Sequence, residues 1–221
     1  MTKIEEKGYI GDVVLSERPS NYSRDKVTLA SGAGDLKIGT VLGKRTKSSA
    51  VLAAAGGNTG NGAGALAGTA LGAKAEVGVY TLTCTAEAAN GGTFQVVAPS
   101  GYRLPDLKVG TAYAGDHINL TISDGAEDFD LGDSFTVTVS GTGKYVPAEY
   151  GAVDGTGVGD AILLENADAT DADVENVLVL ARDALVSDPA LTYDASADDD
   201  TKIAALKAGL AAKGIVFTQG A

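Results

Sequence analysis

The residues of this chain that could carry out chemistry are few. Its 221 residues include one histidine, His117, and one cysteine, Cys84, and no tryptophan. A zinc site usually needs at least two Cys or His ligands, and a Ser-His-Asp triad would have to use His117. A lone cysteine between Thr83 and Thr85 is typical of a small buried side chain rather than a reactive thiol. We therefore expect no catalytic residues, no internal disulfide and no cofactor.

Two acidic stretches could bind a metal, because carboxylates are the hard oxygen ligands that calcium prefers. The first stretch lacks both the spacing and the central glycine of an EF-hand loop. Solvated loops are the ordinary role of such residues, so we expect no metal site in either stretch. The first contains Asp168, Asp171, Asp173 and Glu175, and the second contains Asp124, Glu127, Asp128, Asp130 and Asp133.

A run rich in glycine and alanine, from Gly57 to Gly68, contains the G-x-G spacing of phosphate-binding loops. No Lys-Ser or Lys-Thr pair follows it, so it is not a P-loop. It also lacks a preceding strand and a clear following helix, which argues against a dinucleotide-binding turn. The low complexity of residues 53–68 predicts a flexible connector.

The composition excludes several classes of partner. The chain has 17 basic and 29 acidic residues, a net charge of −12, which argues against binding to nucleic acid or to anionic membranes. No stretch of 18 apolar residues could span a membrane, and residues 1–8 lack the apolar core of a signal peptide, so we expect synthesis in the cytosol. Thirty glycines and only 5% aromatic residues predict a thin core and a subunit whose stability depends on partner subunits.

The hydrophobic pattern predicts a mainly β chain in three parts, with one helix near the C-terminus. The first 20 residues have no sustained apolar pattern and are typical of an arm. In residues 48–142 short strands follow one another without helices, which predicts a small sandwich or barrel. The strands expected in the three parts are 12–15, 26–30 and 39–44; then 77–85, 92–98, 117–123 and 134–140; then 161–164, 175–181 and 215–217.

The helix is expected before the last of these strands. Ser196 or Asp198 can cap its first turn, and acidic residues there complement the helix dipole. Gly214 suits the left-handed position that ends a helix. The residues of its apolar stripe are Ile203, Leu206 and Leu210.

Several short segments outside residues 48–142 come in an order that is characteristic of one protein family. They are Asn21–Gly32, Gly39–Lys44, Gly143–Pro147, Asp154–Thr156, Ala161–Leu163, Val179–Ala184 and the final helix with Gly214–Val216. Together they resemble the lambda-type head decoration proteins of tailed phages, over about residues 1–46 and 143–221. The family's short turn between Thr46 and Gly143 is here replaced by the β-rich part. A hairpin tip tolerates such an insertion, because the entropy of loop closure grows slowly with length.

The resemblance implies an organisation and a structural function. Residues 1–20 would be a capsid-binding arm, residues 21–47 and 143–221 a discontinuous decoration-protein core, and residues 48–142 an inserted, immunoglobulin-like β domain. Such proteins form homotrimers at three-fold positions on the outer surface of the virion. There they hold neighbouring copies of the major capsid protein against DNA pressure, and they are not enzymes. Trimerisation would also supply the apolar burial that a thin core lacks.

On this basis the capsid-binding residues lie in and just after the arm, which the family orders on the shell by adding a strand to a capsid sheet. Arg18 and Arg24 would be charged partners, with Tyr22 between them in the chain. The alternative is an arm that packs on its own subunit. The apolar residues expected at the capsid are Ile10, Val13, Val14 and Leu15.

The inserted part leaves a second function open, in which it attaches virions to a host surface or a glycan. Tyr80, Phe94, Tyr102 and Tyr113 could form a contact patch, although core packing is the commoner use of aromatic residues. A bacterial adhesin would need a secretion signal. An enzyme would have to operate with almost no His or Cys, and we expect none.

Overall fold

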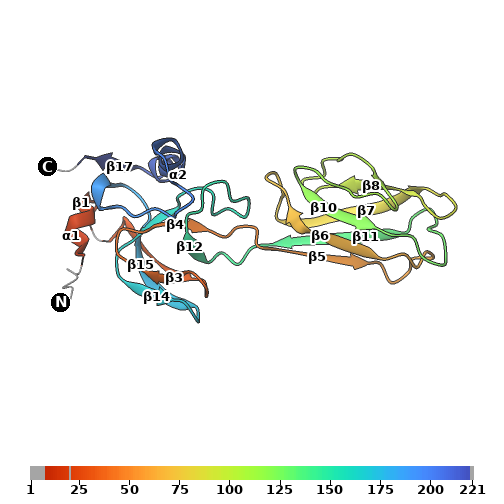
Figure 1. Cartoon of the computed structure of the whole chain (residues 1–221), viewed down its shortest axis with the longest axis horizontal. Helices are drawn as coiled ribbons and strands as arrows, with labels where there is room; N and C mark the ends of the chain where they lie inside the picture. The colour runs from red at the N-terminus through yellow and green to blue at the C-terminus, as the bar shows by residue number, and fades with distance from the viewer. Residues whose placement is uncertain (1–7, 20, 220–221) are drawn as a thin grey trace. The chain divides into compact units, whose positions relative to one another are not determined.

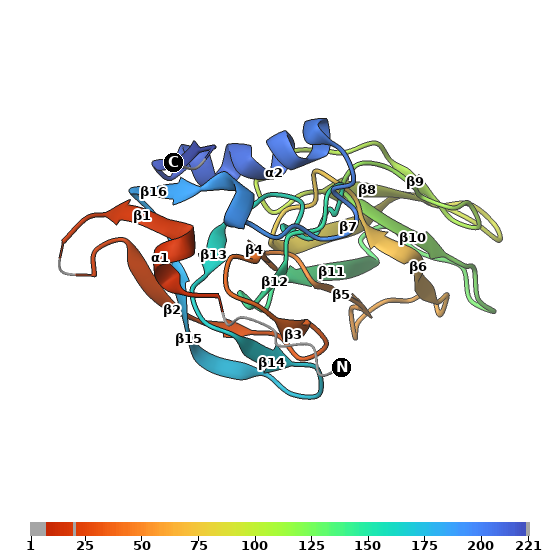
Figure 2. The same cartoon turned by 60° about the vertical axis from the view of Figure 1, so that its left-hand side comes forward.

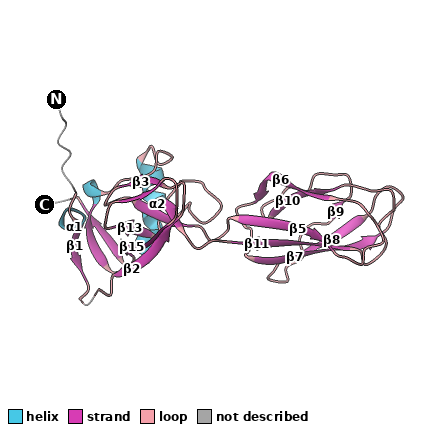
Figure 3. Ribbon diagram, turned by 90° about the horizontal axis from the view of Figure 1, so that it is seen from below, coloured by secondary structure: helices cyan, strands magenta, loops and turns pink. Residues whose placement is uncertain are grey.

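The computed structural model describes residues 8–19 and 21–219 and divides the chain into two compact units (Figure 1). Unit 1 comprises residues 1–45 and 143–221, and unit 2 comprises residues 46–142. Unit 2 is built of strands and loops alone, and the long helix of unit 1 lies near the C-terminus (Figure 3). The predicted mainly β fold with one C-terminal helix is therefore confirmed.

Five strands of unit 1 close into a small barrel, in the order β12-β2-β15-β13-β4. Every neighbouring pair is antiparallel except β12 with β2. Leu29, Leu42 and Val179 are fully buried in its core. The barrel strands are β2 (Arg24–Leu29), β4 (Val41–Lys44), β12 (Tyr145–Pro147), β13 (Ala161–Leu163) and β15 (Val174–Leu180), and a separate ribbon pairs β3 (Gly34–Leu36) with β14 (Ala167–Ala169).

A second sheet of unit 1 has the order β1-β16-β17. The central strand β16 is antiparallel to β1 and parallel to β17, and Figure 2 shows β1 beside β16. Two leucines of the long helix, Leu206 and Leu210, are fully buried in the same core as Val186. The elements are α1 (Ile10–Val13), β1 (Val14–Glu17), β16 (Ala184–Ser187), the 3-10 turn η1 (Asp188–Ala190), α2 (Asp200–Ala212) and β17 (Ile215–Thr218).

The cap of α2 differs from the prediction. The carboxylate of Asp199 accepts a hydrogen bond from the backbone N–H of Lys202 at 2.9 Å, so Asp199 is the N-cap. Ser196 instead accepts the backbone N–H of Tyr150 at 2.8 Å, and Asp198 pairs with the Lys202 side chain at 2.5 Å. Three consecutive aspartates, residues 198–200, lie at the start of the helix, and pattern alone does not choose among them.

We expect Asp199→Ala to lower the free energy of unfolding by about 1 kcal/mol, because one N–H of the first turn loses its partner. Asp198→Ala is the matched control, since it removes only an exposed ion pair, which contributes little to stability. Urea denaturation monitored by circular dichroism measures the loss of unfolding free energy in both variants. A larger loss in Asp198→Ala would contradict the capping assignment.

Unit 2 contains a five-stranded antiparallel sheet, β5-β11-β7-β8-β9, and a two-stranded ribbon of β6 and β10. Phe94, Phe129 and Phe135 fill its core edge to face, with ring centroids 5.1–5.8 Å apart. The four strands predicted here are found, and the immunoglobulin-like class stays a prediction. The bounds are β5 (Ser49–Ala54), β6 (Gly64–Leu71), β7 (Gly78–Ala86), β8 (Thr93–Val97), β9 (Leu107–Lys108), β10 (Ile118–Ile122) and β11 (Ser134–Ser140).

The expectation of a flexible connector over residues 53–68 is wrong. Strand β5 extends to Ala54, and β6 begins at Gly64 and pairs with β10. Between them the chain packs against an aromatic ring, since a Cβ added to Gly60 or Gly62 would lie 2.4 Å from Phe129. The glycines therefore allow the backbone to approach the core closely.

Candidate functional site

The segment that precedes the barrel is docked on unit 1. Residues 10–13 form the short helix α1, so the strand predicted over residues 12–15 is wrong for its first half. Val13 is 2% exposed and belongs to the core around Val186, while Leu15 on β1 is 46% exposed. The described part of the predicted arm thus adopts the alternative arrangement, packed on its own subunit. Residues 1–7 of that arm lie outside the described residues.

Ser23 joins this segment to the barrel and to β16. Its side chain is fully buried, and its hydroxyl accepts the backbone N–H of Arg18 at 3.1 Å and donates to the carbonyl of Asp183 at 2.9 Å. Its own carbonyl accepts the N–H groups of Ala181 and Arg182. These bonds hold Arg18, Ser23 and Asp183 against one another.

This turn presents Tyr22 between two guanidinium groups, and we name Arg18, Tyr22 and Arg182 the Tyr22 platform. The Tyr22 ring centroid lies 5.7 Å from Cζ of Arg18 and 5.6 Å from Cζ of Arg182, within the range of cation–π attraction. Arg182 also donates to the Tyr22 carbonyl at 2.6 Å. Tyr22 remains 54% exposed, so the platform offers part of an aromatic side chain flanked by two arginines.

Acidic side chains balance these cations. Arg18 lies 3.5 Å from the carboxylate of Asp183, and Arg182 pairs with Asp25. Arg24 donates two hydrogen bonds to Glu17, at 2.6 and 2.8 Å, which raises the pKa of Arg24 above its ordinary value. The bidentate pair connects β2 to β1 and fixes the position of the edge strand.

Two hollows border the platform, and both reach Asp183 and Gly214. The larger, about 700 Å³, is lined by polar groups that include Tyr145 and Lys213. The smaller, about 370 Å³, is lined by residues of β1 and by Val216, an exposed residue of β17. This surface combines apolar, aromatic and charged groups, which suits contact with a protein.

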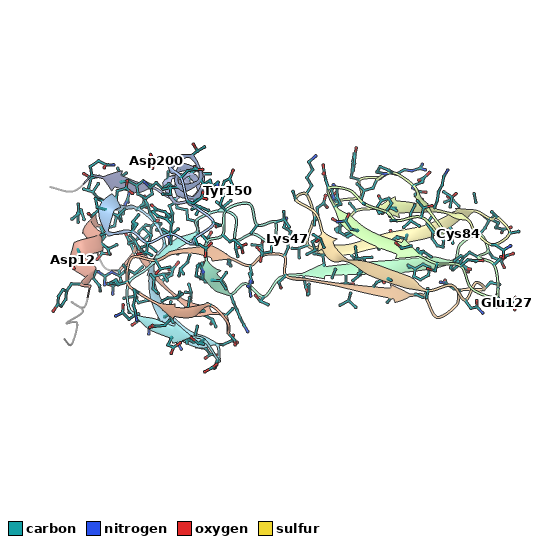
Figure 4. All side chains as sticks on the ribbon, in the orientation of Figure 1. Asp12, Lys47, Cys84, Glu127, Tyr150 and Asp200 are labelled. Atoms are coloured by element: carbon teal, nitrogen blue, oxygen red, sulfur yellow. The ribbon has the colours of Figure 1, made fainter. Side chains whose placement is uncertain are left out.

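Cys84 and Asp168, which were considered above for chemistry, take part in the packing and hydrogen bonding of the fold. Cys84 is buried on β7, as predicted (Figure 4). Asp168 accepts the backbone N–H and the hydroxyl of Thr170, and these bonds lower the pKa of its carboxyl. Within residues 8–19 and 21–219, no three His, Cys, Asp or Glu side chains gather closely enough to hold a metal ion. No helix in those ranges is long and apolar enough to cross a membrane.

Residues 3–215 match the family described as bacteriophage lambda head decoration protein D. The chain belongs to this family. It is therefore a phage head decoration protein, a structural component associated with the capsid of the virion, and its family is not one of enzymes.

Two solved structures resemble this decoration protein weakly. Two crystal structures of FlgL from Xanthomonas campestris match at a TM-score of 0.32, with 21% and 23% sequence identity. The matches cover 48% and 46% of this chain and only 34% and 32% of FlgL. We therefore draw neither fold nor function from them. No curated protein matches the chain.

The predicted capsid-binding residues of the decoration protein separate into two groups. Leu15, Arg18 and Tyr22 are exposed, whereas Ile10, Val13 and Val14 pack in the core around Val186 and Arg24 pairs with Glu17. The platform member Arg182 was not predicted as a site residue. Its only signal in the sequence was the segment Val179–Ala184, one of those that carry the family resemblance.

Proposed function

We propose that this decoration protein forms homotrimers at the three-fold positions of the expanded head, on its outer surface. There it would hold neighbouring copies of the major capsid protein together against the pressure of packaged DNA. Membership of the decoration family over residues 3–215 is the observation that carries the proposal. The composition also supports it, because a chain with 5% aromatic residues gains stability from apolar area buried between copies.

The capsid contact is proposed to form at β1 and the Tyr22 platform. Among the described residues β1 pairs only with β16, so its outer edge can accept a strand of the major capsid protein. Leu15 and Tyr22 supply exposed apolar area beside that edge, and Arg18 supplies a cation. Val13 is buried, so it would contact the capsid only if α1 and β1 separated from β16. In this structure it holds the edge strand β1 in position.

We expect Leu15→Asp and Tyr22→Ala each to weaken binding to expanded, undecorated capsids at least about tenfold, because central aromatic and apolar residues carry most of the energy of an interface. Leu15 is exposed, so Leu15→Asp should keep the stability of the isolated protein to within about 0.5 kcal/mol, whereas Tyr22→Ala should lose about 1–2 kcal/mol because two cation–π contacts are lost with the ring. Co-sedimentation with capsids of the cognate phage measures the affinity.

Tyr150→Ala is the matched control, because Tyr150 is a tyrosine of unit 1 that is 41% exposed and takes no part in the platform. It should bind capsids like the unaltered protein. Undiminished binding by both Leu15→Asp and Tyr22→Ala would move the capsid contact to another surface.

A second, separable function is proposed for unit 2, namely attachment to a host surface. The observation that favours it is a pocket in unit 2 whose walls include two tyrosines, Tyr102 and Tyr113. Tyr80 and Phe94, by contrast, are fully buried and serve the core.

A further inference from the structure

The pocket of unit 2 has a volume of about 430 Å³, within the range typical of small-molecule sites. Its floor is apolar, with Leu104 and Ile118 buried beneath it. Two loops form the walls, residues 102–105 and residues 113–118, and Lys74 lies at the rim. None of these groups has a role in the capsid contact proposed for unit 1.

The two tyrosines of the walls differ in how they are held. The backbone of Tyr113 exchanges hydrogen bonds with Leu120, and its hydroxyl donates to the carbonyl of Pro105 at 3.0 Å, so both ends of this residue are fixed. Tyr102 is 66% exposed, although its carbonyl accepts the N–H of Ala98 at 2.9 Å. The pocket therefore has one rigid aromatic wall and one exposed ring on an anchored backbone, which lowers the entropy lost on binding.

The polar groups of the pocket carry no net charge. Lys74 and Asp116 form an ion pair at 2.8 Å, with 70% and 64% of their side chains exposed. An ion pair so exposed contributes little to stability, so a ligand can use its donors and acceptors at little cost. The backbone places the pair, because the N–H of Lys74 donates to the carbonyl of Asp116 at 2.7 Å and Gly72 allows the close approach.

His117 adds a polar ring to the pocket. Its Nδ1 lies 3.2 Å from the hydroxyl of Tyr80, which also accepts the backbone N–H of Glu76 at 2.7 Å. Nδ1 is thus engaged by Tyr80, and the second ring nitrogen, Nε2, is a further polar group that can hydrogen-bond a ligand. The pocket thus combines aromatic walls, an apolar floor and balanced donors and acceptors.

We infer that this pocket binds a neutral saccharide. A pyranose ring has apolar faces that can pack on Tyr102 and Tyr113, and hydroxyl groups that donate to carboxylates, accept from ammonium groups and hydrogen-bond to imidazole nitrogens. The volume has room for about two such rings. An anionic ligand would call for a net positive lining, which the Lys74–Asp116 pair does not supply. This inference rests on the binding role proposed for unit 2 and is independent of capsid decoration.

The test is titration of the 15N-labelled full chain with D-glucose, D-galactose and N-acetyl-D-glucosamine, each up to about 100 mM, followed by amide chemical shifts. At least one of these sugars is expected to give saturable shifts at residues 102–104 and 113–118, with a dissociation constant in the millimolar range. Tyr102→Ala should weaken binding at least about tenfold, and Tyr102→Phe should retain it. Tyr150→Ala in unit 1 is the control and should bind like the unaltered protein.

Three results would overturn the inference. They are the absence of saturable shifts with all three sugars, undiminished binding by Tyr102→Ala, and tighter binding of the anionic sugar N-acetylneuraminic acid. Capsid co-sedimentation of Tyr102→Ala separates the two functions, because this variant should bind capsids normally. Sugar binding without capsid binding would count against the proposal for unit 1 alone, and capsid binding without sugar binding would count against the pocket alone.

Discussion

Replacing residues 46–142 with a Pro-Asp dipeptide should leave a folded unit 1 that binds expanded capsids. The residues that flank the removed segment already lie beside each other in a hairpin. The backbone N–H of Arg45 donates to the carbonyl of Lys144, and that of Gly143 donates to the carbonyl of Arg45, each at 2.9 Å. These bonds extend the antiparallel pairing of β4 with β12. With Gly143 in the left-handed conformation (φ 69°) they match a three-residue hairpin loop, and Pro-Asp before that glycine suits its type I turn.

The shortened protein should bind capsids with an affinity within about threefold of the full chain, because the buried clusters around Leu29 and Val186 consist of residues of unit 1 alone. Circular dichroism and capsid co-sedimentation measure its folding and its affinity. The shortened protein should also lose any saccharide binding. An unfolded product would mean that unit 1 depends on unit 2, and a folded product that ignores capsids would place the capsid contact in unit 2.

The second large effect is expected from Asp133→Ala in unit 2. Asp133 is 5% exposed, and its carboxylate accepts the backbone N–H groups of Thr59, Gly60 and Asp130 at 2.8–3.1 Å. Without the carboxylate these donors lose their partner, at a cost of about 1–3 kcal/mol for each one left buried. We expect unit 2 to lose about 3 kcal/mol or more of its free energy of unfolding, as measured by urea denaturation.

Asp130→Ala is the control, because its side chain is exposed and its backbone N–H remains available to Asp133. It should lose less than about 0.5 kcal/mol. Equal losses in the two variants would show that the carboxylate of Asp133 does not organise this loop.

The same carboxylate makes the stability of unit 2 depend on pH. Burial alone would raise the pKa of Asp133, but the hydrogen bonds from Gly60, Thr59 and Asp130 outweigh it and lower the pKa below its ordinary value. Its contribution is therefore fully present above the ordinary pKa of an unfolded aspartate, about 3.9, and is lost as the pH falls through the lower folded value. Asp133→Asn should flatten this part of the profile of unfolding free energy against pH.

Strands whose residues alternate were predicted well from the sequence. The stretch from Ser134 to Ser140 alternates without interruption, and β11 has the same bounds. Strand β6 was missed because alanine and glycine give little periodic signal, and its pairing with β10 decides its conformation. Helix α1 was missed for a similar reason, since four residues have no stable helix of their own and the burial of Val13 holds them.

The candidate site was predicted in part. Arg18 and Tyr22 were singled out through the family resemblance, and the structure brings them together. Arg182 lies 160 residues after Tyr22, and no local sequence pattern predicts that it contacts the Tyr22 ring as Arg18 does. The buried hydroxyl of Ser23, which organises the turn, likewise has a partner on the distant residue Asp183. Contacts of such long range depend on the closed barrel and not on neighbours in the sequence.

The most direct test of the central proposal is an electron cryo-microscopy reconstruction of expanded, undecorated capsids of the cognate phage after incubation with the full chain. The proposal predicts added density for three copies at each three-fold position on the outer surface, with β1 and the Tyr22 platform against the major capsid protein. Capsids without added density at saturating protein, or with density at other positions, would contradict it.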